Sequence, residues 1–161
     1  MKQLALAAVA CLVVTEASAT DWAFIGIDKA YETSYWMNVS SRHMEEKYAY
    51  VWLADVSSSA STKHDVRLSY YQADCKTYDY TMLEASYYAK GKLLSTTKDG
   101  GTFSAGNQHS LSWLIVNSMC TGRTQHGIVH PFTGPAELAE IGIKLNNGLK
   151  EGAEKRRGQP F

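Results

Sequence analysis

The pattern of apolar and polar positions predicts strands over most of the chain. From residue 22 to about residue 118 the sequence is rich in Tyr, Trp, Val and Thr and contains no proline, a composition that favours strands. The segment YAYVWLADV, residues 48–56, is largely apolar on both of its alternating faces, so we expect a central strand covered on each side. The other expected strands are residues 22–27, 34–39, 66–73, 77–88, 93–97 and 111–116.

The pattern changes after Cys120, where a connecting stretch of residues 121–135 leads to a helix expected to begin near Pro135. One apolar stripe at helical spacing runs along this helix: Leu138, Ile141, Leu145 and Leu149. Three glycines weaken it by about 1 kcal/mol each relative to alanine: Gly142, Gly148 and Gly152. The helix therefore needs a packing partner, and we expect an α+β domain in which it lies on an antiparallel sheet of about six strands.

The first nineteen residues are typical of a secretory signal peptide, with Lys2, an apolar run over residues 4–14, and small residues at Ala17 and Ala19. The mature chain is expected to begin at Thr20. A membrane anchor would need about 20 apolar residues, and lipidation of Cys11 is the other alternative. We expect one domain, with the sheet over residues 20–133, the helix over 134–157 and a frayed tail over 158–161.

Charge excludes one class of partner. The chain has 16 basic and 16 acidic residues, and removal of the leader takes one of each, Lys2 and Glu16. A neutral chain lacks the basic face of a nucleic-acid-binding protein. No second apolar run is long enough for a membrane span, so we expect an exported protein of the periplasm, the outer-membrane surface or the medium.

Two cysteines, Cys75 and Cys120, remain after the leader, and in an oxidising compartment such a pair most often forms one disulfide. Closing a loop of this length is worth roughly 4 kcal/mol in the chain-entropy model. A redox or metal-binding pair is the alternative, but the C-x-x-C spacing of such sites is missing.

Catalytic and metal-binding patterns are weak. The five histidines carry no H-E-x-x-H motif, and they are His43, His64, His109, His126 and His130. The last two have the four-residue spacing of a helical metal pair, but Gly127 and Pro131 disfavour a helix there. Asp74 and Asp79 flank Cys75 and are interpreted as solvated strand ends. We expect no enzymatic activity and no bound metal.

The aromatic content is the stronger signal. All ten tyrosines lie in the strand-rich part, and neighbouring residues of a strand point to opposite faces. Two adjacent pairs therefore cannot both lie in one core, and they form our candidate binding surface: Tyr70, Tyr71, Tyr87 and Tyr88. Cross-strand packing is the alternative role. Basic residues near the end of the chain, such as Lys150, could bind polyanions, or could complement a helix C-terminus.

Four blocks of the sequence resemble the surface-adhesin protein E family of small exported Gram-negative proteins: WAFIGI, YVWLADV, DCKTYDYTMLEASYYAKGKLLST and LSWLIVNSMC. The resemblance spans residues 22–120. It implies an antiparallel sheet with a C-terminal helix, pairing of Cys75 with Cys120, and adhesion to host matrix or serum proteins such as vitronectin, laminin and plasminogen. The segment between Trp113 and Cys120 is shorter than in the family, and the lipoprotein anchor is missing.

We therefore expect an exported, non-enzymatic binding domain whose partner is a protein, with dimerisation open. The alternative is a periplasmic binder of a small ligand, with hemin as the candidate. A hydrophobic cleft that holds His126 or His130 would favour the small ligand, whereas a flat tyrosine-rich edge of the sheet would favour the adhesin.

Overall fold

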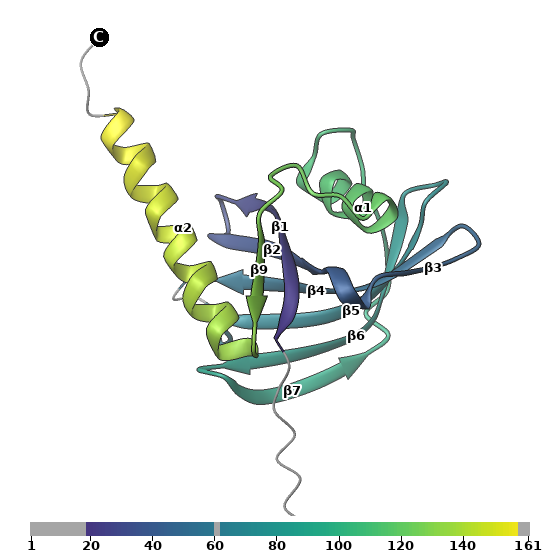
Figure 1. Cartoon of the computed structure of the whole chain (residues 1–161), viewed down its shortest axis with the longest axis horizontal. Helices are drawn as coiled ribbons and strands as arrows, with labels where there is room; N and C mark the ends of the chain where they lie inside the picture. The colour runs from purple at the N-terminus through teal and green to yellow at the C-terminus, as the bar shows by residue number, and fades with distance from the viewer. Residues whose placement is uncertain (1–18, 60–61, 158–161) are drawn as a thin grey trace, which may run out of the picture.

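The fold is a twisted antiparallel sheet of nine strands with one helix on each face (Figure 1). It is a computed structural model, which describes residues 19–59 and 62–157. The expected α+β class, C-terminal helix and disulfide are confirmed, and the sheet has nine strands instead of about six. The signal peptide predicted over residues 1–19 lies outside the described residues except for Ala19, as does the tail predicted over 158–161.

The main path of the sheet runs β7-β6-β5-β4-β2-β1-β9, while β3 pairs with β4 and β8 pairs with β6. The strands are β1 (Thr20–Asp28), β2 (Thr33–Asn38), β3 (His43–Glu45), β4 (Tyr48–Ser57), β5 (Val66–Asp74), β6 (Asp79–Ala89), β7 (Lys92–Lys98), β8 (Thr102–Ser104) and β9 (Val129–Phe132). The helices are α1 (Leu111–Thr121) and α2 (Pro135–Arg157), with a short 3-10 helix at Val39–Ser41.

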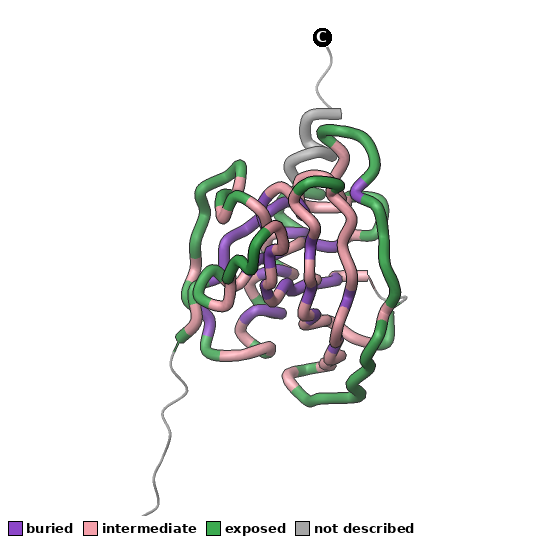
Figure 2. The backbone as a smooth tube through the Cα atoms, turned by 90° about the vertical axis from the view of Figure 1, so that its right-hand side faces the viewer, coloured by how far each residue is buried: buried purple, intermediate pink, exposed green. Residues whose placement is uncertain are grey.

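β4 is the central strand that its two apolar faces predict. Its odd-numbered side chains enter one buried cluster together with Val116 and Met119 of α1. Its even-numbered side chains Ala54 and Val56 enter a second cluster together with Leu138 and Ala139 of α2. We call the two sides of the sheet the α1 face and the α2 face. Buried residues accordingly lie mainly on the inner strands, whereas every residue of the edge strand β7 is exposed (Figure 2).

The strand predicted over residues 111–116 is wrong, because this segment belongs to helix α1. The Ser110 side chain accepts a hydrogen bond from the backbone N–H of Trp113 and caps the helix start. Gly122 ends it in the left-handed conformation, with φ of 71°. The period of a continuous apolar run does not distinguish a helix from a buried strand. The length of this segment, eleven residues between two capping residues, is typical of a helix.

Helix α2 is anchored on the sheet as predicted. At Gly142 the helix backbone lies so close to β4 that an added Cβ would sit 2.7 Å from the Cβ of Val56. The buried amide of Asn146 donates to the backbone oxygens of Glu32 and Val56 at 3.0 and 3.2 Å. Lys150 pairs with the Glu32 carboxylate at 2.6 Å. Gly142 thus weakens the helix intrinsically but permits its contact with the sheet.

The two helices cover opposite ends of the strands (Figure 1). α1 packs over the end of the sheet that carries Ala49 and Ala73, and α2 packs over the end that carries Val56 and Val66. Among the described residues, each face therefore has one half packed under a helix and another half that the helix leaves largely uncovered. In the described part of the chain, no helix is long and apolar enough to cross a membrane.

Candidate functional site

Aromatic side chains occupy the half of the α2 face that α2 leaves uncovered. His43 stacks on Tyr50 with ring centroids 5.0 Å apart and an interplanar angle of 8°. The Tyr70 ring lies 6.3 Å from Tyr50 and 5.3 Å from Trp52. We call these four residues, His43, Tyr50, Trp52 and Tyr70, the aromatic surface.

Strand register brings the aromatic surface together. His43 is the cross-strand partner of Tyr50, and Trp52 is the partner of Tyr70. The Tyr50 hydroxyl accepts a hydrogen bond of 2.7 Å from the side-chain amide of Gln72, which fixes the direction of its ring. Tyr50 and Tyr70 belong to neither buried cluster, and the His43 side chain is 47% exposed. The rings are thus pre-positioned; His43 is exposed, whereas Tyr50, Trp52 and Tyr70 are half-buried, and Trp52 packs against the cluster under α2.

The four tyrosines predicted as one binding surface are divided between the two faces. Tyr70 lies in the aromatic surface, whereas Tyr71 is 7% exposed and belongs to the buried cluster under α1. Tyr87 packs at the edge of that same cluster. Tyr88 packs against the cluster under α2. The opposed directions of each pair are as expected, but two cores, one on each face, absorb three of the four rings.

The uncovered half of the α1 face carries polar groups instead. Tyr35, Asp55, Arg67 and Tyr87 are successive cross-strand partners on β2, β4, β5 and β6. We call them the polar row. Asp55 and Arg67 form a salt bridge there, and their side chains are only 12% and 31% exposed. Burial raises the pKa of the Asp55 carboxyl, and the charge and hydrogen bond of Arg67 oppose that rise.

Two small cavities flank the polar row, and Tyr35, Asp55 and Arg67 line both of them. The inner cavity, of about 180 Å³, lies against the N-terminal half of α1 and is also lined by Tyr71 and Tyr80. The outer cavity, of about 280 Å³, faces the turn between β1 and β2. Both fall below the roughly 300 Å³ at which sites for drug-sized ligands begin.

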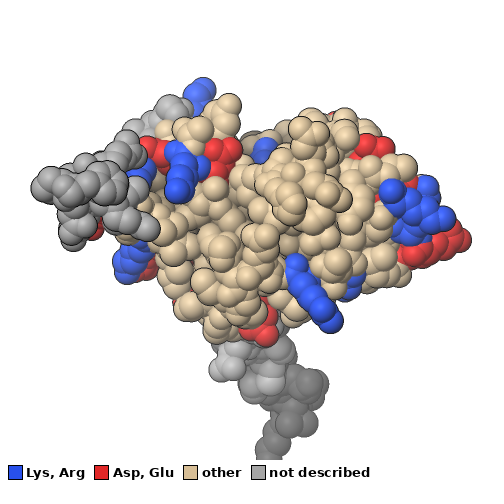
Figure 3. All heavy atoms as spheres, turned by 90° about the horizontal axis from the view of Figure 1, so that it is seen from above, with Lys and Arg blue, Asp and Glu red and all other residues tan. Residues whose placement is uncertain are grey.

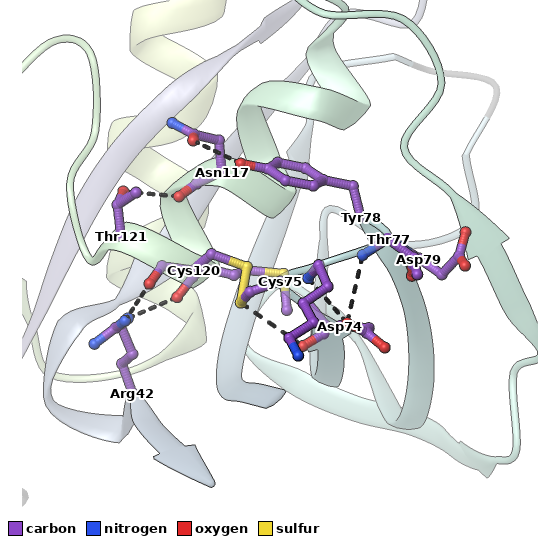
Figure 4. Close-up of a disulfide and its surroundings, with 12 residues drawn as sticks. Arg42, Asp74, Cys75, Thr77, Tyr78, Asp79, Asn117, Cys120 and Thr121 are labelled. Atoms are coloured by element: carbon purple, nitrogen blue, oxygen red, sulfur yellow. Dashed lines mark hydrogen bonds between the residues drawn. A yellow bond between two sulfur atoms is a disulfide. The ribbon is translucent and has the colours of Figure 1, made fainter. Parts of the chain in front are cut away.

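The expected disulfide between Cys75 and Cys120 is present, with Cα atoms 5.6 Å apart (Figure 4). Cys120 lies in the last turn of α1, so the bond ties the end of β5 to this helix and not to the connecting stretch that precedes α2. Arg42 supports the same end of α1, since its guanidinium donates to the backbone oxygens of Met119 and Cys120 at 2.6 and 2.5 Å. This cation also complements the negative end of the helix dipole.

The other charged candidates from the sequence have structural partners. The Asp74 carboxylate lies 2.5 Å from Lys47 and accepts the backbone N–H groups of Lys76 and Thr77, which lowers its pKa. Asp79 opposes Ser104 in the pair β6–β8. Asp74 and Asp79 thus stand at the ends of β5 and β6, as interpreted from the sequence.

His126 and His130 lie in different environments. His126 precedes β9 and lies 5.2 Å from the ring of Phe24, whereas His130 is in β9 and stacks on Phe132 at 4.7 Å. Neither lines the inner or the outer cavity. Within the described residues, no group of three or more His, Cys, Asp or Glu is placed to hold a metal ion.

Figure 3 shows one face of the molecule, on which blue and red side chains occur in small groups among larger areas of uncharged side chains. This face shows no continuous basic patch, in agreement with the neutral composition.

The sequence interpretation missed three members of the aromatic surface, His43, Tyr50 and Trp52, and every member of the polar row except Tyr87. The signal for the former was the run HMEEKYAY, in which two alternating segments flank the two-residue turn Glu46-Lys47 and so predict the β3–β4 hairpin. The polar row has no such signal, because it depends on register across four strands. No family model, curated protein or solved structure matches the chain.

Proposed function

We propose that the chain is an exported, non-enzymatic binding protein that engages a protein partner through the aromatic surface. The observation that carries this proposal is the set of neighbouring rings of His43, Tyr50, Trp52 and Tyr70, on the half of the α2 face that α2 leaves uncovered. Tyrosine and tryptophan are enriched at protein interfaces, because their rings give large contact areas and their polar tips form hydrogen bonds.

The position of these rings on strands supports the proposal further. Strands hold the rings more rigidly than a loop would, so little side-chain entropy is lost when a partner binds. Gln72 lies beside the aromatic surface and bonds the Tyr50 hydroxyl, and the His43 ring nitrogens add polar groups within the surface. Such a mixture of aromatic anchors and polar neighbours is typical of interface centres.

The resemblance to the surface-adhesin protein E family suggests the class of partner. By that resemblance the partner is a host matrix or serum protein, with vitronectin, laminin and plasminogen as the first candidates. Export through the predicted signal peptide would place the domain where it can meet such a partner.

The test is capture of immobilised vitronectin, laminin and plasminogen by the wild type and by single variants. Tyr70→Ala and Tyr50→Ala should each weaken capture by about thirtyfold, the equivalent of about 2 kcal/mol for an interface anchor. Tyr31→Ala is the matched control, since Tyr31 is 72% exposed and lies on the turn between β1 and β2. This control should capture as well as the wild type.

Thermal unfolding of each variant separates loss of binding from loss of fold. The proposal fails if the wild type captures none of the three proteins. It also fails if Tyr31→Ala weakens capture as much as Tyr70→Ala, or if each loss of capture only follows a loss of stability.

A further inference from the structure

The inner cavity lies on the α1 face, opposite to the aromatic surface, and its lining is more polar than packing requires. It contains two carboxylates, Asp28 and Asp55, and one guanidinium, Arg67. Arg67 is already paired with Asp55. Buried ion pairs are often no more stabilising than apolar side chains of the same size, so stability alone does not explain this one.

Three tyrosines, Tyr35, Tyr71 and Tyr80, line the cavity together with these charged groups. The pKa values of Tyr35, Tyr71 and Tyr80 are all raised, first by burial and next by the charge of Asp55. In each case Arg67 acts in the opposite direction, but more weakly than Asp55. The lining therefore holds two carboxylates and one guanidinium, which leaves one carboxylate in excess beside these rings.

The rest of the lining suits a short apolar group. Leu53 rises from the sheet, and Leu111 and Ile115 descend from α1 on the opposite wall. The electron-rich faces of tyrosine rings attract cations, and the attraction grows when water is excluded. The volume of about 180 Å³ limits the ligand to a few heavy atoms.

We propose that the inner cavity binds a small organic ammonium ion, with the charged nitrogen near Asp28 and Asp55 among the tyrosine rings and the alkyl part against Leu53, Leu111 and Ile115. One positive charge neutralises the net single negative charge of the lining. This site is independent of the proposed protein partner, because the aromatic surface lies on the other face of the sheet.

The test uses three probes of nearly equal shape and different charge: n-propylammonium, propionate and n-propanol. Each is titrated into the purified domain while the methyl chemical shifts of Leu53, Leu111 and Ile115 are followed by NMR. n-Propylammonium should shift these methyl groups saturably, whereas propionate and n-propanol at the same concentrations should leave them in place.

Two variants of equal net charge locate the site. Asp28→Asn should weaken n-propylammonium binding by about tenfold or more. The substitution keeps the oxygen that accepts the backbone N–H groups of Ala30 and Tyr31, so the turn is retained. Asp79→Asn removes the same charge from β6 outside the cavity and should leave binding unchanged.

Several results would overturn the proposal. Saturable shifts with propionate would identify an anion site at Arg67, and equal shifts with n-propanol would identify an apolar cavity without charge selectivity. No saturable shift with n-propylammonium would rule out the site. An equal loss in Asp28→Asn and Asp79→Asn would mean that only the overall charge of the protein matters.

Discussion

Single residues show why the same substitution has opposite effects at two places on one helix. Gly142 and Gly148 both lie in α2, but an alanine Cβ at position 142 would clash with Val56, whereas a Cβ at position 148 meets nothing within 4 Å. Helix propensity favours alanine at both positions. Packing therefore decides the sign at the first position, and propensity decides it at the second.

We predict that Gly142→Ala lowers the free energy of unfolding by about 1 to 3 kcal/mol, because the helix must move off β4. Gly148→Ala should raise it by about 0.5 to 1 kcal/mol. Urea unfolding of both variants beside the wild type measures the two effects. Two changes of the same sign would contradict the close contact between α2 and Val56.

A second prediction at this scale concerns alkaline pH. Burial, and then the charge of Asp55, raise the pKa of Tyr71 from 10.0 to about 12. Between pH 10 and pH 12 the folded state thus keeps a proton that the unfolded state has lost. The free energy of unfolding is unaffected well below pH 10 and decreases as the pH rises through this range. Tyr71 alone should lower the free energy of unfolding by about 2 kcal/mol between pH 10 and pH 12.

Urea unfolding across this pH range, compared between the wild type and Tyr71→Phe, isolates the contribution of Tyr71. The variant should show a smaller slope, and the remainder includes Tyr35, whose pKa is also raised. An unchanged slope would mean that Tyr71 titrates alike in both states.

Some residue contacts could be predicted from the sequence and others could not. The pairing of Cys75 with Cys120 could be predicted because only two cysteines follow the predicted signal peptide. The partnership of Asp55 with Arg67 could not, because these residues meet only through the register of β4 and β5. The packing of Tyr71 and Tyr88 could not be predicted either, because a pair of adjacent tyrosines does not show whether helices cover one face of the sheet or both.

At the scale of elements, α1 shows how a short apolar segment can be misassigned. LSWLIVNSMC has the composition of a buried strand, and only the flanking Ser110 and Gly122 mark a helix. α2 was predictable because its apolar stripe is separated by polar residues, which gives a clear helical period. β4 was predictable for a different reason: a strand that is apolar on both faces is covered on both sides and so lies at the centre of a sheet.

The disulfide ties α1, and not α2, to the sheet. We predict that replacing both Cys75 and Cys120 by serine lowers the free energy of unfolding by about 2 to 5 kcal/mol. Because the bond joins β5 to the last turn of α1, amide hydrogen exchange should increase more in α1 than in the part of α2 that contains Leu138 and Asn146.

Thiol titration of the exported wild type is the companion measurement. Two reactive thiols in native protein would contradict the disulfide. A uniform increase of exchange over both helices would show that the bond stabilises the whole domain without a local effect on α1.

At the scale of the whole molecule, the start of the sheet coincides with the predicted processing site. β1 begins at Thr20, directly after the expected cleavage position. We predict that intact-mass measurement of the exported protein gives a chain that starts at Thr20, because Ala17-Ser18-Ala19 fits signal peptidase. A lipidated Cys11 at the N-terminus would contradict this prediction.

The strand order has a consequence for the time course of folding during synthesis. Thr20, in the first strand, pairs with Phe132 in the last, and Phe132 is buried in the cluster under α2. A chain growing from the ribosome cannot complete this pairing until most of its length has been made. Contacts so distant in sequence form slowly, because a long loop must close first. For the export that the N-terminal sequence predicts, such a delay would keep the nascent chain unfolded while a translocation channel, which threads only unfolded polypeptide, accepts it.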